Sequence, residues 1–261
     1  MSQKQNPAQE VFSFHYFEVP IYKLPFYLFL YLKKKKTKGL IHSESLVPMQ
    51  LGASLFSKKR YHLSQIALIA FWQSEEDLDQ FLNLSRNHPI HSSWQMRLRL
   101  YRRWGKISEL DSAVLYPKPS KEDTPMVAIT LARLKISQLF RFTKWGRPVE
   151  KQVRDHPSQR FAFAAFRPFR NFLTFSIWNS EHEMIQMVHG LEPTKDGLEH
   201  KEAMAERNRK DFHTEFTTLR FEILNHCATR NGSGTLGVPD AGYGFPEFIR
   251  LGNPVSASTL N

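Results

Sequence analysis

The same order of apolar and polar positions occurs twice along the chain. Residues 71–78 (FWQSEEDL) reappear as residues 177–184 (IWNSEHEM), so that Trp72 corresponds to Trp178. In both copies an apolar run ends at the tryptophan, and a serine follows with an acidic residue three positions beyond it. Serine with this spacing is typical of a helix N-cap, and acidic residues suit the first helical turn. Each copy therefore predicts a strand, a short turn and a capped helix.

Alternating and helical apolar spacings on either side extend this unit into two copies with the same order of elements. In the first copy we expect strands at Val11–Val19, Gln50–Phe56, Leu63–Trp72 and Trp94–Tyr101, and helices at Leu24–Lys36 and Glu75–Ser85. In the second copy we expect strands at Val127–Leu134, Arg160–Phe166, Phe172–Trp178 and Leu219–Leu224. The helices expected there are Ser137–His156, with a break near Gly146 and Pro148, then Glu181–His189 and His200–Phe216.

This order, βαββαβ, is that of the ferredoxin-like unit, an antiparallel sheet with both helices on one face. One unit leaves the other face of its sheet bare, and two copies can bury both bare faces by packing them together. We therefore predict an α+β fold in which two ferredoxin-like repeats form a dimeric-type α+β barrel. The repeats would cover residues 1–113 and 126–226, with a Pro-containing linker at 114–125 and an irregular C-terminal tail at 227–261.

Aromatic residues supply the candidate core of this barrel. Trp72 and Trp178 end equivalent strands, and a repeated tryptophan at a strand end is more often core packing than a redox or stacking group. Five phenylalanines of the second copy are expected to fill the interior between the sheets: Phe161, Phe163, Phe166, Phe172 and Phe175.

The charge of the chain raises the question of nucleic acid. The 261 residues include 36 Lys or Arg and 25 Asp or Glu, which gives a net charge of +11. Residues Gln159–Phe166 also have the aromatic alternation of an RNA-stacking strand. Arg160, however, stands where that pattern has glycine, the segment falls on the wrong strand of its unit, and the basic residues are spread through the chain. These departures argue against nucleic acid as a partner.

The apolar segment Ile21–Leu32 is about 12 residues long, too short for the roughly 20 that cross a bilayer. Four lysines, Lys33–Lys36, follow it. Two interpretations stay open: a buried helix with a cationic C-terminal end, or peripheral contact of Leu24–Lys36 with an anionic membrane surface. A single cysteine, Cys227, excludes an intramolecular disulfide framework. Because no secretory signal begins the chain, we expect a cytoplasmic protein, with or without peripheral membrane contact.

A family resemblance covers most of residues 11–226. Its clearest part is Thr174–Trp178, Glu183-Met184 and Phe221–Leu224, and between them lie His200, Arg207, Phe212, Glu215, Phe216 and Arg220. Fainter matches are Ala128–Ala132 and Ile69–Trp72. With these residues the chain resembles the spheroidene monooxygenase family of carotenoid-oxygenating enzymes. It departs from the family in an insertion at Leu191–Gly197, in the charged hairpin Arg167–Arg170 and in its greater basicity.

The resemblance implies a haem-dependent oxygenase that uses dioxygen and an electron donor to insert oxygen into an apolar, carotenoid-like substrate. It implies that His200 is the axial ligand of the haem iron, and His189, His213 and Cys227 are the alternatives in this chain. Arg207 and Arg220 would bind haem propionates or an acidic substrate, because guanidinium binds carboxylate in a bidentate manner. The alternative for these arginines is a surface ion pair with Glu206, Glu215 or Glu222. The alternative for the whole protein is a small-molecule-binding or non-catalytic α+β barrel without haem.

Overall fold

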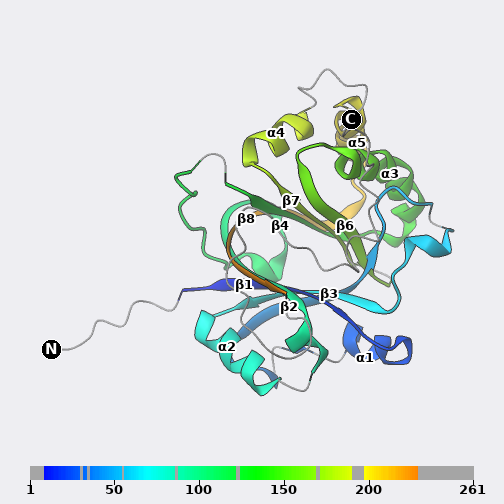
Figure 1. The fold of residues 1–261 in the computed structure, drawn as a ribbon. Coiled ribbons are helices and arrows are strands. Elements are labelled where there is room, and N and C mark those ends of the chain that lie inside the picture. The colour runs from blue at the N-terminus through cyan, green and yellow to red at the C-terminus, as the bar shows by residue number, and fades with distance from the viewer. Residues whose placement is uncertain are drawn as a thin grey trace, which may run out of the picture.

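The computed structural model describes residues 9–29, 32–33, 36–54, 56–85, 88–121, 124–168, 171–189 and 197–228. Eight antiparallel strands form one closed barrel in the order β1-β3-β2-β6-β7-β5-β8-β4. Helices cover the barrel on two opposite sides, with α1 and α2 on one side and α3, α4 and α5 on the other (Figure 1). This is the predicted α+β barrel of two ferredoxin-like repeats.

The two repeats occupy consecutive parts of the chain. The first contains β1 (Val11–Glu18), α1 (Leu24–Phe29), β2 (Leu40–Met49), β3 (Gln65–Trp72), α2 (Glu75–Leu84) and β4 (Trp94–Lys106). The second contains β5 (Met126–Leu134), α3 (Leu139–Asp155), β6 (Gln159–Arg167), β7 (Asn171–Trp178), α4 (Glu181–His189), α5 (Gly197–Arg209) and β8 (His213–Ala228).

Two seams join the sheets of the repeats. One is the long pairing of β4 with β8, which runs from Trp94 opposite Ala228 to Lys106 opposite Phe216. Near its end Gly105 has a φ of +81°, and a Cβ there would lie 2.3 Å from the carbonyl oxygen of Phe216, so only glycine fits. The other seam is the short pairing of β2 with β6 between Val47–Met49 and residues 164–166.

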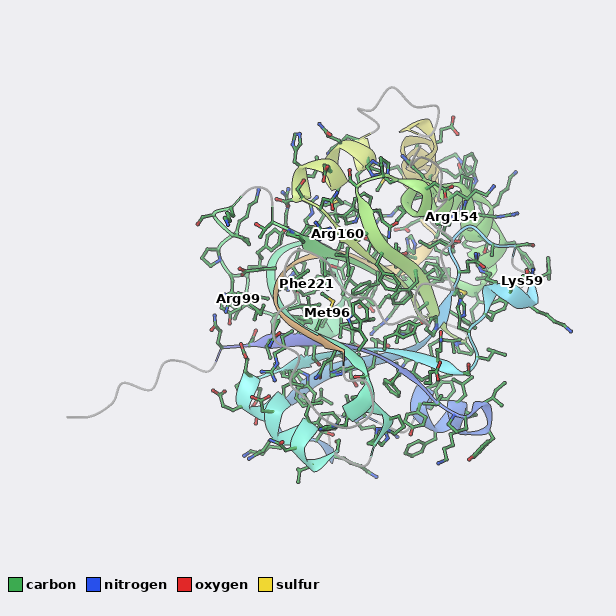
Figure 2. The ribbon with its side chains drawn as sticks, viewed as in Figure 1. Lys59, Met96, Arg99, Arg154, Arg160 and Phe221 are labelled. Atoms are coloured by element: carbon green, nitrogen blue, oxygen red, sulfur yellow. The ribbon has the colours of Figure 1, made fainter. Side chains whose placement is uncertain are left out.

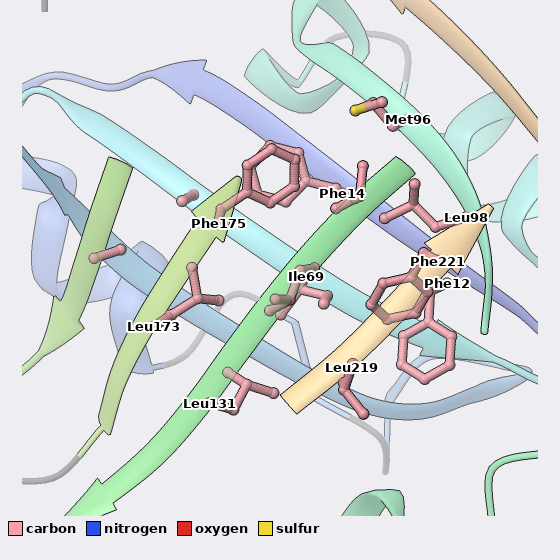
Figure 3. Close-up of a cluster of buried hydrophobic side chains, with 14 of the residues drawn as sticks. Phe12, Phe14, Ile69, Met96, Leu98, Leu131, Leu173, Phe175, Leu219 and Phe221 are labelled. Atoms are coloured by element: carbon pink, nitrogen blue, oxygen red, sulfur yellow. The ribbon is translucent and has the colours of Figure 1, made fainter. Parts of the chain in front are cut away.

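The barrel interior is filled with apolar side chains from both repeats. Because side chains alternate along a strand, every second residue points inward. Phe14 stacks on Phe175 with ring centroids 4.2 Å apart, and Phe12 stacks on Phe71 at 4.4 Å. Figure 3 shows Phe12, Phe14 and Phe175 among aliphatic side chains from strands of both repeats. The interior is therefore a packed core, and a ligand must bind elsewhere.

The repeated strand-end tryptophans and helix caps are present as predicted. Trp72 and Trp178 are buried, and their indole N–H groups donate to Ser13 and Ser176, each at 2.8 Å. The hydroxyl of Ser74 accepts from the backbone N–H of residue 77, and Ser180 caps α4 in the same way through the N–H of residue 183.

Of the five phenylalanines expected between the sheets, only three lie there. Phe161, Phe163 and Phe175 are in the interior, whereas Phe166 and Phe172 are on the opposite face, against the helices. The strand period of two explains the correction, because residues of even number on β6 and β7 face outward. The rings of Phe161 and Phe163, which RNA stacking would need at the surface, are buried inside the barrel.

The strand expected at Gln50–Phe56 is wrong: the strand is β2, at Leu40–Met49. Its polar residues concealed it, above all Glu44, which is buried. Burial by itself would raise the pKa of Glu44, but a hydrogen bond from His42, the charge of Arg167 and a hydrogen bond from Asn171 lower it overall. A charged residue is thus tolerated in β2 because distant parts of the chain neutralise it.

Three helices differ from the expectation. The helix expected at Leu24–Lys36 ends at Phe29. The predicted break near Pro148 does not occur, since α3 continues from Leu139 to Asp155 with that proline inside. The helix expected to reach Phe216 ends at Arg209, and β8 begins at His213, where threonines at 214, 217 and 218 favour an extended backbone. The tail expected at 227–261 lies outside the described residues from 229 onward.

Candidate functional site

A cavity of about 470 Å³ lies in the second repeat, between the outer face of its sheet and helices α3, α4 and α5. Its floor is made by outward-facing residues of β5, β7 and β8, and α3 forms one wall. The volume is within the range of about 300–1,000 Å³ that holds small molecules and cofactors.

The equivalent space of the first repeat is filled by its own side chains. There α1 is described over Leu24–Phe29, whereas α3 covers Leu139–Asp155. Tyr27 and Leu28 of α1 pack directly onto Phe17 and Ile66, and Leu78 of α2 packs against Trp72. In the described part of the first repeat, these side chains occupy the position that corresponds to the cavity of the second.

The cavity walls are mainly apolar. Aromatic and sulfur-containing side chains dominate: Phe142, Trp145, Phe172, Trp178, Met184, Met187, Phe212 and Phe216. Hydroxyl groups of the floor supply a few polar positions: Thr130, Thr174, Ser176 and Thr218. Such a lining suits a ligand with a large apolar body.

His213, the first residue of β8, is part of the cavity wall. Its Nδ1 is 3.1 Å from Oδ1 of Asp211, and its buried Nε2 has no hydrogen-bond partner among the described residues. Burial lowers the pKa of His213 to about 4, so the imidazole is neutral at pH 7. With Nδ1 donating to the carboxylate, Nε2 keeps its lone pair.

Arg207 of α5 also lines the cavity. Its guanidinium carbon lies 4.2 Å from the ring centroid of Phe216 and 5.1 Å from that of Trp104. Its ion pair with Asp211 is long, with Nε 4.0 Å from Oδ1, so the pair expected with Glu206 is not the one observed. Two aromatic faces thus orient a cation that has a weak acidic partner.

Arg220 of β8 lies on the cavity floor and is held by Glu181, with Nη1 2.5 Å from Oε1. Lys118 pairs with the other oxygen of the same carboxylate at 2.7 Å. Burial alone would raise the pKa of Glu181, but hydrogen bonds from Lys118 and Arg220 lower it overall. The pairs expected with Glu215 or Glu222 are therefore wrong, and Arg220 is more firmly neutralised than Arg207.

Arg102 of β4 stands directly opposite Arg220 in the pairing of β4 with β8, and it too lines the cavity. It is exposed and forms no ion pair with the described acidic residues. The side of the cavity formed by β4, β8 and α5 therefore carries three arginines, Arg102, Arg207 and Arg220. This side can attract the acidic group of a ligand.

The other predicted iron ligands are placed unequally. His200 lies on α5, but its side chain is outside the described part of the structure, and so is that of Cys227 on β8. His189, the last residue of α4, is exposed at the rim of the cavity. Among the candidates whose side chains the structure describes, His213 is the buried histidine of the cavity wall.

Sequence reasoning missed Arg102 and Trp104. Both lie on β4 beyond Tyr101, where the expected strand ended, and alternation of apolar residues stops there. No local sequence pattern marks them; they join the site through the pairing with β8, which extends β4 to Lys106.

A second cavity, of about 310 Å³, lies on the other side of α3 and shares Phe142, Glu150 and Phe172 with the first. Among its lining residues Arg60 is paired with Glu150, and Asn171 donates to Glu44 at 2.6 Å. Its charged groups are thus already partnered, and we place the functional site in the first cavity.

Comparisons with known proteins find similarity in structure only. No protein-family model matches the chain, and no curated protein matches it in sequence. Among solved structures, it is similar to a protein of Fusobacterium nucleatum subsp. nucleatum proposed to be a monooxygenase (9% identity, TM-score 0.36, 84% of this chain and 94% of that one). It is similar to an anthrone oxidase-like protein (14% identity, TM-score 0.33, 90% of this chain and 99% of that one). It is also similar to a chlorite dismutase variant from Candidatus Nitrospira defluvii (10% identity, TM-score 0.25, 83% of this chain and 92% of that one).

At these identities and TM-scores the neighbours carry no argument about chemistry, and the assignment of the fold rests on the strand order of the barrel. Within the described ranges, no helix is long and apolar enough to cross a membrane. Among the same residues, no three His, Cys, Asp or Glu side chains converge as they would around a metal ion held by the protein alone. A group that brings most of its own iron ligands needs only one protein side chain.

Proposed function

We propose that the protein is a monooxygenase-type enzyme that holds haem, together with an apolar substrate, in the cavity of the second repeat. The observation that carries the proposal is His213, a buried neutral imidazole in the wall of an apolar cavity with an unpartnered Nε2. The resemblance of the second copy to spheroidene monooxygenases supports the oxygenase class and a carotenoid-like substrate.

The neutral imidazole of His213 and its contact with Asp211 suit a haem ligand. Haem iron accepts neutral imidazole, and a ligating histidine commonly donates its other ring N–H to a carboxylate, which fixes the tautomer. Asp211 is such a carboxylate, 3.1 Å from Nδ1. The same carboxylate accepts the backbone N–H of His213 at 2.9 Å, so the side chain and the main chain are oriented together.

The arginines would bind the propionate groups of haem. Arg207 is available for this because its acidic partner is at the limit of ion pairing, and Arg102 is exposed beside the cavity. Charge-assisted hydrogen bonds from guanidinium to carboxylate are among the stronger polar contacts in proteins. Arg220 would stay with Glu181 and stabilise the floor.

The remaining cavity residues would bind the substrate and exclude water. Haem, when bound, supplies the activation of dioxygen with electrons from a separate donor. The aromatic wall of Phe142, Trp145 and Phe172 provides apolar surface for the substrate. Thr130, Thr174 and Ser176 offer hydroxyl groups that orient a polar end.

The test is the absorption spectrum of the protein reconstituted with haem, in the wild type and in three variants. We expect a Soret band in the wild type that shifts or disappears in His213→Ala and stays unchanged in His189→Ala, which alters the exposed rim. His200→Ala tests the ligand implied by the family resemblance, and we expect no change. A Soret band lost in His200→Ala but kept in His213→Ala would retain haem and overturn the assignment of its ligand.

One observation favours a second candidate, a small-molecule-binding barrel without haem. The imidazole of His213 is packed among Phe142, Phe212 and Phe216, with ring centroids 5.7, 5.8 and 4.9 Å away. In this second candidate the ring closes the cavity wall by packing and binds no iron. A folded wild-type protein with no Soret band, but with saturable binding of an apolar fluorescent probe that Ala128→Phe abolishes, would support this candidate against the oxygenase.

A further inference from the structure

The first repeat exposes an unusual set of apolar side chains at α1 and the turn before it. Ile21 is 59% exposed, Tyr22 76% and Phe29 51%. These residues lie within nine positions of one another, in the short turn Ile21–Lys23 and in α1. The opposite face of α1 is anchored in the protein, since Tyr27 and Leu28 are buried. A helix that covers a soluble core normally has polar residues on its outer face, and this one has aromatic residues there.

The charged residues of the chain segment that contains α1 are all basic. Between residues 19 and 43 the sequence contains Lys23, the four lysines 33–36 and Lys38, and no Asp or Glu. Among the described ones, Lys23, Lys33, Lys36 and Lys38 are exposed. The net charge of the whole chain is also positive. An apolar projection next to a run of exposed lysines matches a surface that is anionic outside and apolar beneath.

We infer that α1 and its preceding turn form a docking surface for an anionic lipid bilayer. Tyr22, Phe29 and Ile21 enter the interface between headgroups and acyl chains, while the lysines contact the lipid headgroups. Because α1 is fixed to β2 and β3 by its buried face, the contact positions the whole barrel on the membrane (Figure 1). A second copy of the chain is the poorer occupant, because a two-fold contact would bring the same lysines face to face.

The experiment measures partitioning of the full chain onto vesicles by sedimentation. Vesicles of phosphatidylcholine alone are compared with vesicles in which one lipid in four is phosphatidylglycerol. We expect binding to the anionic vesicles, little binding to the neutral ones, and loss of binding when salt is raised. No binding to anionic vesicles, or equal binding to both kinds, would overturn the inference.

Two double variants and one control locate the contact. The first variant, Tyr22→Ser with Phe29→Ser, removes the apolar part of the surface. The second, Lys33→Glu with Lys36→Glu, reverses two charges. Each lysine near an anionic membrane contributes about 1 kcal/mol, so partitioning of the second variant should fall more than roughly tenfold. The control is Ile136→Ser with Phe140→Ser. Ile136 lies in the turn before α3 and Phe140 in α3, the helix of the second repeat that corresponds to α1, and they are 70% and 77% exposed.

The control should bind vesicles like the wild type, and both test variants should not. Circular dichroism confirms that each variant is folded. Unchanged binding of Tyr22→Ser with Phe29→Ser would contradict the proposed surface. A wild-type dimer in light scattering that becomes a monomer in this variant would identify a second copy as the occupant and overturn the membrane assignment.

Discussion

The guanidinium of Arg60 lies against the carboxylate of Glu150 in a two-pronged ion pair. Nη1 is 3.0 Å from Oε2, and Nη2 is 2.9 Å from Oε1. Arg60 belongs to the connection between β2 and β3, and Glu150 belongs to α3, so the pair joins the two repeats. The side chain of Arg60 is 2% exposed, and the N–H of Gly52 donates to the same carboxylate at 2.9 Å. The pair thus reinforces the short seam between β2 and β6.

Breaking this pair should cost much of the stability of the barrel. Glu150→Gln leaves the charge of Arg60 buried without its counter-charge, and we expect the free energy of unfolding to fall by about 3–5 kcal/mol. The measurement is urea unfolding followed by circular dichroism. Asp155→Asn, which alters an exposed pair with Arg154 on the same helix, is the control and should change stability by no more than about 1 kcal/mol. Equal effects of the two variants would contradict the structural role of the pair.

The aromatic interior predicts a second loss of stability. Phe175 is 0% exposed and packs on Phe14 and Phe163, with ring centroids 4.2 and 5.4 Å away. Phe175→Ala should lower the free energy of unfolding by about 3–5 kcal/mol, because it removes buried apolar surface and leaves a void. Phe140→Ala removes the same side chain from a position that is 77% exposed and should change stability by roughly 0.5 kcal/mol or less. A barrel with a loosely packed interior would tolerate both changes alike.

The neutral state of His213 predicts how stability depends on pH. Its pKa is about 4 in the folded chain, because of burial, against an ordinary value of 6.5. Between these values the unfolded chain binds a proton that the folded chain does not, so the free energy of unfolding falls as the pH falls from 6.5 to 4. His15, whose pKa burial lowers to about 3, acts in the same direction.

Replacing the imidazole tests this assignment. In His213→Gln the free energy of unfolding should depend less steeply on pH across this window, by up to one proton. Urea unfolding at a series of pH values, for wild type and variant, measures the difference. Parallel curves for the two proteins would show that His213 titrates in the folded chain as it does in the unfolded one.

Arg207 is predicted to bind the acidic groups of haem. Arg207→Gln should weaken haem affinity by roughly tenfold to a hundredfold, the range expected when a charge-assisted hydrogen bond is lost. Arg209→Gln is the matched control, because Arg209 is near the same end of α5 but is exposed and paired with Glu206. Haem titration followed by absorbance measures both affinities. An equal loss in both variants would indicate a general effect of charge and not a contact in the cavity.

Local signals in the sequence predicted much of the fold. Ser74 and Ser180, each with an acidic residue three positions later, correctly predicted the starts of α2 and α4. The strands β1, β3, β6 and β7 have clear apolar patterns. By contrast, β2 was missed because its buried Glu44 forms an ion pair with Arg167 and accepts a hydrogen bond from Asn171, both far away in sequence. Figure 2 shows the ordinary separation, with the charged Lys59 at the outer edge and the apolar Met96 and Phe221 within the barrel, to which the buried Glu44 is an exception. Composition alone does not locate such residues.

The candidate site was harder to predict than the fold. The sequence indicated Arg207 and Arg220 through a family resemblance, and both line the cavity. It named His213 as an alternative iron ligand but assigned it to a helix, although the threonines around it favour a strand. Arg102 joins the site only through the pairing of β4 with β8, which no local pattern encodes.

The most direct test of the central claim is the affinity for haem of a protein whose cavity is filled. Ala128 of β5 lies on the cavity floor, and Ala128→Phe places a large ring in the space while the barrel interior stays unchanged. Titration with haem, followed by absorbance, should give saturable binding with a Soret band in the wild type and none in the folded variant. Equal affinity in both proteins would contradict a haem site between the second sheet and its helices.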